Sequence, residues 1–161
     1  MAGNVKPIPN GFHAVTPYLI VDDGAAAIEF YKRAFGATET LRMPGPDGKL
    51  GHAEIRIGDS VIMLGDEIPG MGARSPQSLG GVTGAITLHV EDVDAVYARA
   101  IAAGATSRVP VTDMFYGDRA GQLVDPFGHE WAISTHKEDV SPEEIARRAK
   151  VFFAKMSASG A

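Results

Sequence analysis

Two polar residues of complementary chemistry, His52 and Glu54, stand two positions apart in this sequence. They alternate with Ala53, Ile55 and Ile57, a pattern that predicts a strand with one polar and one apolar face. A carboxylate close to an imidazole raises its basicity and fixes its tautomer, so the pair suits a general base and its partner. The alternative is a solvated polar face without chemistry, which is common for such residues.

Three further titratable residues have both a chemical and a structural interpretation. His89 ends a predicted strand, where it could bind a ligand, cap the following helix or remain solvated. His129 belongs to a predicted turn, where hydrogen bonding at the surface is the favoured role. Glu130 could act as an acid or base if a cavity raised its pKa, or could pair with Arg119 or a lysine. Arg119 could instead pair with an anionic ligand group or lock its loop through Asp118.

The composition limits the classes of function. The chain has 161 residues, 45% of them hydrophobic, a formal net charge of −5 and no cysteine. The lack of cysteine excludes a disulfide framework, thiolate catalysis and a cysteine-based zinc site. No basic block points to nucleic acid, no apolar run approaches the roughly 20 residues that span a bilayer, and residues 1–11 lack the pattern of a signal peptide. We therefore expect a cytoplasmic protein with no nucleic-acid or membrane partner.

The sequence repeats itself at a nearly constant offset. Val90, in the segment 88–92, lies 69 residues after Val21, in the similar segment 19–23. Residues 104–106 repeat residues 36–38 at an offset of 68, and Gly128 follows Gly58 by 70. Each copy reads as a strand, a helix and three further strands. In the first copy we expect the first strand over residues 14–21, the helix over about 25–35 and the last strand over 60–64. The repeat therefore predicts an α+β fold of two β-α-β-β-β modules.

This duplication places residues 1–161 in a single domain. Module one covers residues 12–64 and module two residues 82–135, with a linker over 65–81 that is rich in glycine, proline and serine. The capping box at residues 141–144 predicts a C-terminal helix over 141–156. Its apolar stripe should pack on the body or on a partner subunit.

Several motifs resemble those of the glyoxalase/bleomycin-resistance/dioxygenase superfamily, also called the vicinal oxygen chelate proteins. They are Val21-x-Asp23 followed by Phe30-Tyr31 and Phe35-Gly36, the second-half copy of this pattern, and the turn Asp125-Pro126-Phe127-Gly128. Within the superfamily the chain is similar to the PhnB-like group, through His52-Ala53-Glu54, Ile57-Gly58-Asp59-Ser60 and the segments 125–131 and 135–144. The resemblance implies two half-barrel sheets around a concave small-molecule site, often completed across a homodimer.

The resemblance also implies where metal-dependent members hold their ion. Each module places a His or Glu ligand on its first and last strand, and these positions correspond here to Thr16 and Ala85, to Ile62 or Met63, and to Ala132. None of these side chains is a good ligand for a hard or borderline divalent ion. We therefore expect no metal and no cofactor.

The resemblance and the strand period together indicate which side chains face the site. Residues two positions from the expected ligands share their face, and others border its mouth. The candidate ligand-binding residues are Thr16, Tyr18, His52, Glu54, Thr87, His89, Tyr116, Arg119, Gln122 and Glu130.

Three functions are compatible with this pattern. The leading one is a metal-independent protein that binds and sequesters a small molecule, without assigned catalytic residues. The second is a lyase, isomerase or dioxygenase that acts through acid–base chemistry or a metal at a displaced site formed by His52, Glu54, His89 and Glu130. The third is a scaffold that binds a partner through the C-terminal helix and the loop 65–84.

Overall fold

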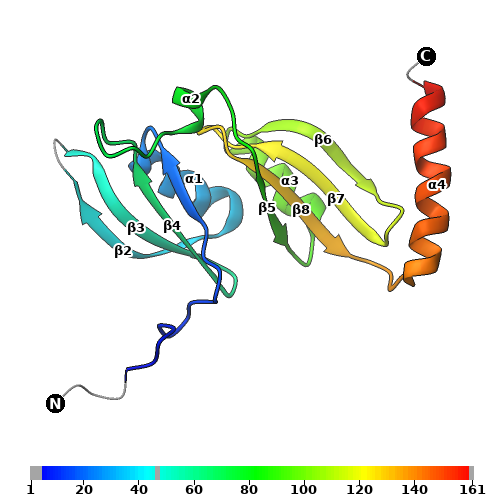
Figure 1. Ribbon diagram of the computed structural model, residues 1–161, viewed down its shortest axis with the longest axis horizontal. Coiled ribbons are helices and arrows are strands. Elements are labelled where there is room, and N and C mark those ends of the chain that lie inside the picture. Colours follow the sequence, from blue (N-terminus) through cyan, green and yellow to red (C-terminus); the bar gives the residue numbers. More distant parts are fainter. Residues whose placement is uncertain (1–4, 46–47, 160–161) are drawn as a thin grey trace.

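The computed structural model describes residues 5–45 and 48–159, which form two modules of the same design (Figure 1). The elements of module one are β1 (Tyr18–Val21), α1 (Gly24–Phe35), β2 (Thr38–Pro44), β3 (Leu50–Ile57) and β4 (Ser60–Asp66). Those of module two are β5 (Ala85–His89), α3 (Val93–Ala102), β6 (Thr106–Asp113), β7 (Asp118–Val124) and β8 (Glu130–His136). A short helix, α2 (Pro76–Leu79), lies between the modules, and α4 (Pro142–Ser159) follows them.

The two sheets have matching topology. Over the described residues, module one has the strand order β1-β4-β3-β2 and module two the order β5-β8-β7-β6. In each sheet the first strand is parallel to the last, and the other pairs are antiparallel. The predicted α+β fold and its duplicated β-α-β-β-β unit are confirmed.

The repeat extends to individual hydrogen bonds at the helix starts. Asp23 caps α1 by accepting from Ala26 N at 2.9 Å, and Asp92, 69 residues later, caps α3 by accepting from Ala95 N at 3.0 Å. Such side chains satisfy backbone N–H groups that have no partner within the helix. The first residues of the two helices, Gly24 and Val93, also have N–H groups without a partner in the helix. Side chains at the ends of β4 and β8 accept hydrogen bonds from these two groups.

These last acceptors are also related by the repeat. Asp66 accepts from Gly24 N and, at 2.6 Å, from Leu50 N, whereas Thr135 accepts from Val93 N at 2.9 Å. Strand β4 continues two residues beyond its expected end at Leu64. Its last residue, Asp66, is buried and hydrogen-bonded to the first residues of α1 and β3.

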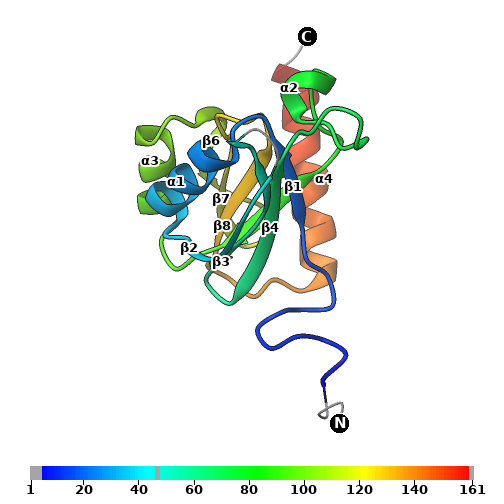
Figure 2. The ribbon, with the colours of Figure 1, turned by 90° about the vertical axis from the view of Figure 1, so that its left-hand side faces the viewer.

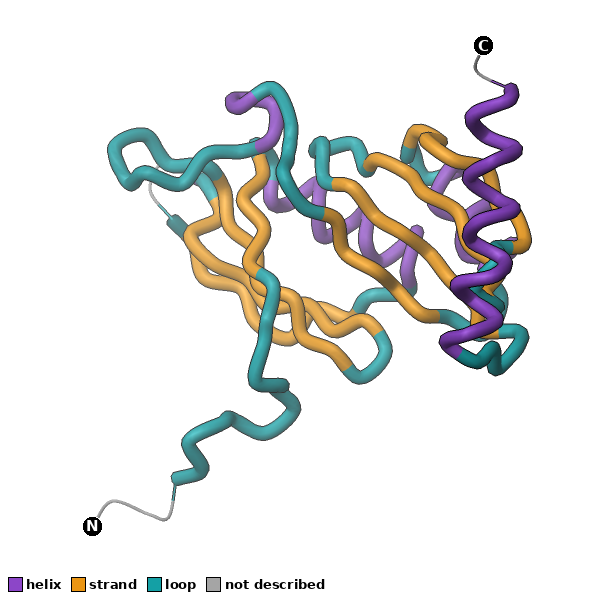
Figure 3. Tube along the Cα trace, turned by 45° about the vertical axis from the view of Figure 1, so that its right-hand side comes forward, coloured by secondary structure: helices purple, strands orange, loops and turns teal. Residues whose placement is uncertain are grey.

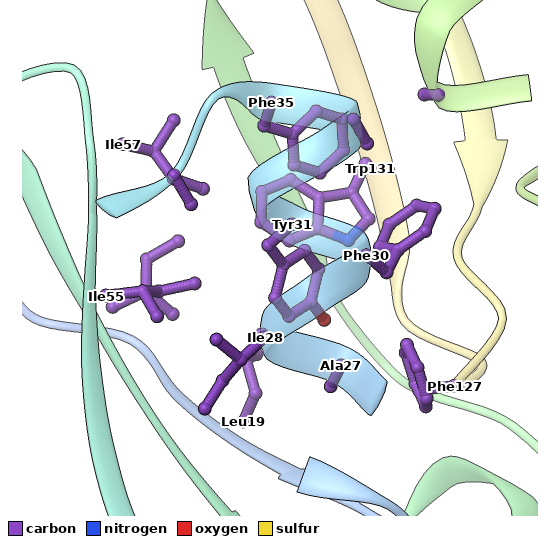
Figure 4. Packing of buried hydrophobic residues seen from close by; sticks show 14 of the residues in the cluster. Leu19, Ala27, Ile28, Phe30, Tyr31, Phe35, Ile55, Ile57, Phe127 and Trp131 are labelled. Atoms are coloured by element: carbon purple, nitrogen blue, oxygen red, sulfur yellow. The ribbon is translucent and has the colours of Figure 1, made fainter. Parts of the chain in front are cut away.

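One aromatic cluster joins the modules (Figure 4). Its rings come from α1 and from the β7–β8 hairpin, and they are Phe30, Tyr31, Phe35, Phe127 and Trp131. Ring pairs of this kind, 4.7–6.4 Å between centroids, bury much apolar area and add specific edge and offset contacts. The helices α1 and α3 also pack on each other, so the two modules share a single core.

Asp125 is the polar centre of that cluster. It accepts from the Tyr31 hydroxyl at 2.7 Å and from Trp131 Nε1 at 2.9 Å, and its other oxygen accepts from the backbone N–H groups of Phe127 and His129. The turn expected over residues 125–128 is thus present, and its first residue also connects the two modules. Burial, reinforced by the charge of Asp125, raises the pKa of Tyr31 well above its usual value.

The remaining elements lie outside this core. Figure 2 shows α1 and α3 on one side of the sheets and α4 on the other. The connection from β4 to β5 passes over one end of both sheets (Figure 3). The segment before β1 contacts the body at Gly11, whose carbonyl accepts from Arg56 at 3.4 Å, and residues 5–10 lead away from it. Part of the β4–β5 connection forms α2, although the sequence suggested only an irregular linker. No helix within residues 5–45 and 48–159 has the length and apolar character needed to cross a bilayer.

Candidate functional site

The sheet of module one has an open face turned away from α1. Ala53, Ile55 and Ile57 of β3 are buried, so the alternating His52 and Glu54 point to the opposite side. The register places further side chains on this open face beside them, namely Tyr18 of β1, Leu41 and Met43 of β2, Arg56 of β3, and Val61 and Met63 of β4. The polar and apolar faces expected from the sequence of this strand are confirmed.

Three of the predicted site residues meet on this open face. The Tyr18 hydroxyl lies 3.2 Å from His52 Nδ1, and Glu54 Oε1 lies 3.6 Å from His52 Nε2. His52 and Glu54 are largely covered, with 22% and 20% of their side chains exposed, whereas Tyr18 is 47% exposed. An imidazole between a phenol and a carboxylate can hold or pass a proton along a defined line.

A groove of about 740 Å³ lies beside Tyr18, and residues of both modules line it. It is lined by residues of β1 and β5 and by residues 79–84 of the connection before β5. Tyr18 lines it from module one, and His129 and Glu130 line it from module two. His129 is tied to module one by a contact of 2.9 Å between its Nε2 and the carbonyl oxygen of Ile20, rather than lying free at the surface.

A second cavity, of about 660 Å³, contains two other predicted residues. Thr87 and His89 line it together with apolar side chains of both modules that include Phe35, Ile62 and Trp131. The predicted residues are therefore divided between neighbouring hollows. The four residues of the expected displaced site do not come together, because His52 and Glu54 belong to module one, His89 to this cavity and Glu130 to the groove.

Glu130 forms an ion pair with Arg108, not with Arg119 or a lysine. The distance from Glu130 Oε1 to Arg108 Nη2 is 3.0 Å, and 41% of the Glu130 side chain is exposed. The pairing across the sheet that the sequence allowed is present, but with a different arginine. Glu130 still borders the groove and can interact there with a donor or a cation.

Arg119 points to the helix side of the sheet in module two, away from the open face. Its guanidinium makes two bonds to Asp94 of α3, of 2.7 and 2.8 Å, and one of 3.1 Å to Asp113. These hydrogen bonds lower the pKa of Asp94 and raise that of Arg119. Arg119 therefore has a structural role and does not face the open side where a ligand would bind. Its partners are Asp94 and Asp113, whereas the sequence analysis had considered Asp118.

The three remaining predicted residues lie apart from one another. Thr16 precedes β1, and its hydroxyl donates to the carbonyl of His13 at 3.5 Å. Gln122 is on β7, in register with Ala132 on the open face of module two. Tyr116 lies in the β6–β7 turn, where burial and then the charge of Asp118 raise its pKa.

The residues at the superfamily's metal positions do not fit a divalent ion. These positions are Thr16 and Ala85, Ile62 or Met63, and Ala132, and in the observed register the neighbours of Met63 and Ala132 are Tyr18 and Thr87. These phenol, thioether, hydroxyl and methyl groups are poor ligands for hard or borderline ions. Within the described part of the chain, no group of three or more His, Cys, Asp or Glu side chains is placed to hold one.

Module two has a polar network that the sequence analysis missed. Asp118 accepts from Ser134 Oγ at 2.8 Å and contacts His136 Nδ1 at 2.8 Å, while His136 Nε2 lies 3.0 Å from Asp139. Hydrogen bonds to Asp118 and then Asp139 raise the pKa of His136. Burial alone would raise the pKa of Asp118, but the bonds from His136 and Ser134 outweigh it and lower that pKa. The sequence did contain one indication of this network. Ser134 and His136 are two positions apart in a strand, so their side chains share a face.

The fold and the site together define a class of protein. It has a duplicated β-α-β-β-β unit, and each sheet has helices on one side and an open, partly polar face on the other. A profile of the Glyoxalase/Bleomycin resistance protein/Dioxygenase superfamily matches residues 11–133. This chain belongs to that superfamily.

The chain is also similar to several individual proteins. The uncharacterized protein Rv0887c of Mycobacterium tuberculosis is 48% identical over 148 residues, covering 90% of this chain and 84% of the relative. The crystallised Arabidopsis thaliana protein At5g48480 superposes with a TM-score of 0.63 at 28% identity, over 76% of this chain and 98% of that one. A Bacillus cereus protein described as a putative 3-demethylubiquinone-9 3-methyltransferase, PhnB protein, has the same fold, with a TM-score of 0.59 at 17% identity over 76% and 99% of the two chains.

Proposed function

We propose that this chain is a metal-independent protein that binds and sequesters a small molecule, acting as a homodimer in the cytoplasm. The observation that carries the proposal is the contact chain of Tyr18, His52 and Glu54, which lies among apolar side chains and beside a groove of about 740 Å³. Small-molecule sites generally combine apolar walls with a few placed polar groups in this way.

The side chains indicate the chemistry of the ligand. Leu41, Met43 and the ring of Tyr18 are 40%, 51% and 47% exposed and offer an apolar surface on which a flat or aliphatic molecule can rest. The carboxylates of Glu54 and Glu130 favour a donor or a cationic group on that molecule. A largely apolar molecule with one amine or hydroxyl is the class that fits.

Two measurements test the proposal on the same preparation. Elemental analysis should find far less than one divalent ion per chain, because the family positions lack ligands. A fragment library followed by ¹H–¹⁵N spectra should shift the amides of β1 and β3, and His52→Ala should weaken binding by about tenfold or more. Met71→Ala, a change at an exposed residue of the β4–β5 connection, is the matched control. One tightly held ion per chain, or fragments that shift only other regions, would contradict the proposal.

Acid–base catalysis at the same three residues is a second candidate. It is favoured by the position of His52 between a hydroxyl and a carboxylate, at 3.2 and 3.6 Å. Such a group can remove a proton next to a carbonyl in a small oxygenated metabolite and return it. With hydroxyacetone in D₂O as the probe, catalysed deuterium exchange that His52→Gln abolishes would support an enzyme. Exchange at the uncatalysed rate would leave the binding role.

A further inference from the structure

The core that the two modules share is incomplete at one end. Phe35, Trp131 and Ile57 lie at this end of the buried cluster (Figure 4). The same three residues line the cavity of about 660 Å³, so this cavity begins where the packed core stops. Protein interiors are normally filled to the density of organic crystals. A hollow of this size beside buried aromatic rings therefore indicates an occupant other than the chain itself.

This cavity is separate from the site on the open face of module one. It extends to the helices, because Phe35 of α1 and both Ala95 and Val96 of α3 line it. These two helices cover the side of the sheets that is opposite the open face (Figure 2). The three residues of the proposed binding site do not line the cavity. A molecule held here is therefore a second ligand, with its own walls.

The inner wall of the cavity is apolar. Ile57 and Ile62 of module one and Val96 of module two are 5%, 4% and 9% exposed. The partly buried Ile86 and Leu88 of β5 belong to the same wall. Such side chains offer water no hydrogen bonds, and apolar cavities accordingly bind apolar molecules. The volume of about 660 Å³ is within the range of small-molecule sites, so the body of the ligand is apolar and compact.

The rim of the cavity carries three carboxylates. They belong to Asp59, Glu91 and Asp92, all of them exposed residues. Asp59 accepts from the Ser60 hydroxyl at 2.9 Å, and Asp92 accepts from Ala95 N at 3.0 Å. The carboxylate of Glu91 has no partner among the described residues. This rim favours a cationic group on the ligand, because charge-assisted hydrogen bonds are the strong ones.

The cationic side chains nearby do not cancel the charge of this rim. Arg99 also lines the cavity, but its Nε donates to the carbonyl oxygen of Ala34 in the last turn of α1, at 3.4 Å. Its Cα is about 10 Å from that of Asp92 along α3, since each helical residue adds about 1.5 Å. Arg56 donates to the carbonyl oxygens of Gly11 and Asp59, not to a carboxylate. The rim at the start of α3 thus remains acidic.

We propose that this cavity is a second binding site, which accepts a compact apolar molecule carrying a protonated amine. The apolar body packs against the inner wall, and the ammonium group lies at the rim beside Glu91. His13 and His89 also line the cavity, and their ring nitrogens can accept a hydrogen bond from the same ammonium group. The inference concerns a different cavity from the proposed function and does not rest on it.

Three probes that share one cage and differ in charge test the site. They are adamantane substituted at a bridgehead with an amine, a hydroxyl or a carboxylate, each titrated into the whole chain at pH 8. Fluorescence reports binding, because the single tryptophan, Trp131, lines the cavity. We expect the amine to bind about threefold to fivefold more tightly than the alcohol, the range for exposed ion pairs, and the carboxylate to bind most weakly. Equal binding of amine and alcohol, tighter binding of the carboxylate, or no binding of any probe at millimolar concentration would overturn the inference.

Two pairs of variants separate the wall from the rim. Ala95→Trp fills the cavity from an exposed position of α3 and should weaken all three probes by about tenfold or more. Ala98→Trp is its control, at an exposed position of the same helix that does not line the cavity. Glu91→Gln should weaken the amine by about threefold and leave the alcohol unchanged, whereas Glu143→Gln in α4 should change neither. Wild-type binding by Ala95→Trp would contradict the assignment of the cavity.

The location of the amine is read independently from ¹H–¹⁵N spectra. The amides of residues 58–62 and 86–96 should shift, and shifts confined to β1 and β3 would place the amine on the open face and overturn the inference. Ala95→Trp should leave fragment binding at β1 and β3 unchanged, and His52→Ala should leave binding of the amine in the cavity unchanged. The second site and the proposed function can therefore fail separately.

Discussion

At the scale of single residues, Asp125 is a buried carboxylate in the core that joins the two modules. It is 4% exposed and accepts four hydrogen bonds, two from the backbone of its turn and two from the side chains of Tyr31 and Trp131. Its charge is balanced by these donors rather than by a cation. A residue that appears in the sequence as a turn former is therefore also the link between two modules.

Replacing Asp125 should consequently destabilise the whole protein. We expect Asp125→Ala to lower the free energy of unfolding by about 3–5 kcal/mol, because it leaves buried donors unpaired in the core. Tyr31→Phe removes one of these bonds and should cost about 1.5–3 kcal/mol. Urea denaturation followed by circular dichroism measures both, and equal effects of the two variants would contradict the shared-acceptor interpretation.

His136 gives the protein a pH-dependent contribution to stability. Its pKa is raised by hydrogen bonds to Asp118 and then Asp139, so the folded state binds the proton more tightly than the unfolded state. This stabilisation is complete below the ordinary histidine pKa of about 6.5 and is lost as pH rises through the higher folded value. We expect His136→Gln to destabilise the protein more at pH 5.5 than at pH 8.5. A difference that does not depend on pH would show that the imidazole acts only through packing.

At the scale of elements, the duplication has given equivalent helices different anchors. The start of α1 is bound by the carboxylate of Asp66, and the start of α3 by the hydroxyl of Thr135. A carboxylate makes stronger, charge-assisted bonds to backbone N–H groups than a hydroxyl does. The same structural task is therefore performed with different strength in the two modules.

This difference should appear in stability measurements. We expect Asp66→Ala to cost about 2–3 kcal/mol, since it frees the N–H groups of Gly24 and Leu50, and Thr135→Val to cost about 1–1.5 kcal/mol. Thermal and urea unfolding of the two variants at pH 7 provide the comparison. If Thr135→Val were the more damaging change, the assignment of Asp66 as the stronger anchor would be wrong.

The elements that the sequence predicted well are those with a long periodic pattern or defined turn chemistry. Helix α1 was expected over residues 25–35 and occupies 24–35, and the turn over 125–128 forms around Asp125. Helix α2 was missed because one turn of helix shows no periodicity, although Ser75-Pro76 is an N-cap followed by proline. Strand β1 was expected from Ala14 but begins at Tyr18, where its pairing with β4 begins.

The candidate site was predictable only within one strand. The pairing of His52 with Glu54 follows from their spacing, whereas the contact of His52 with Tyr18 depends on the register between distant strands. Arg119 and Gln122 were both assigned to the site, yet residues three apart in a strand point to opposite faces. That parity argument could have excluded Arg119, but the partners Asp94 and Asp113 come from the tertiary fold.

At the scale of the whole molecule, the repeat raises the question of whether the modules are independent. Each has its own sheet, and two small sheets with one helix each could unfold separately. The aromatic cluster and the contact of α1 with α3 argue otherwise, because the largest buried side chains of both modules pack in one core. A shared core makes the unfolding of one module expose the apolar surface of the other.

The single tryptophan allows this cooperativity to be tested. Trp131 is in module two and is 1% exposed, whereas Ile55 is fully buried in β3 of module one. Ile55→Ala should destabilise the fold by about 2–4 kcal/mol through lost burial and a residual cavity. If the modules unfold together, the Trp131 fluorescence transition shifts to lower urea by the same amount as the far-ultraviolet circular dichroism transition, at one fixed protein concentration. A fluorescence midpoint that stays at the wild-type value, while circular dichroism shows an earlier phase, would mean that module one unfolds alone and that the shared core does not couple the two halves.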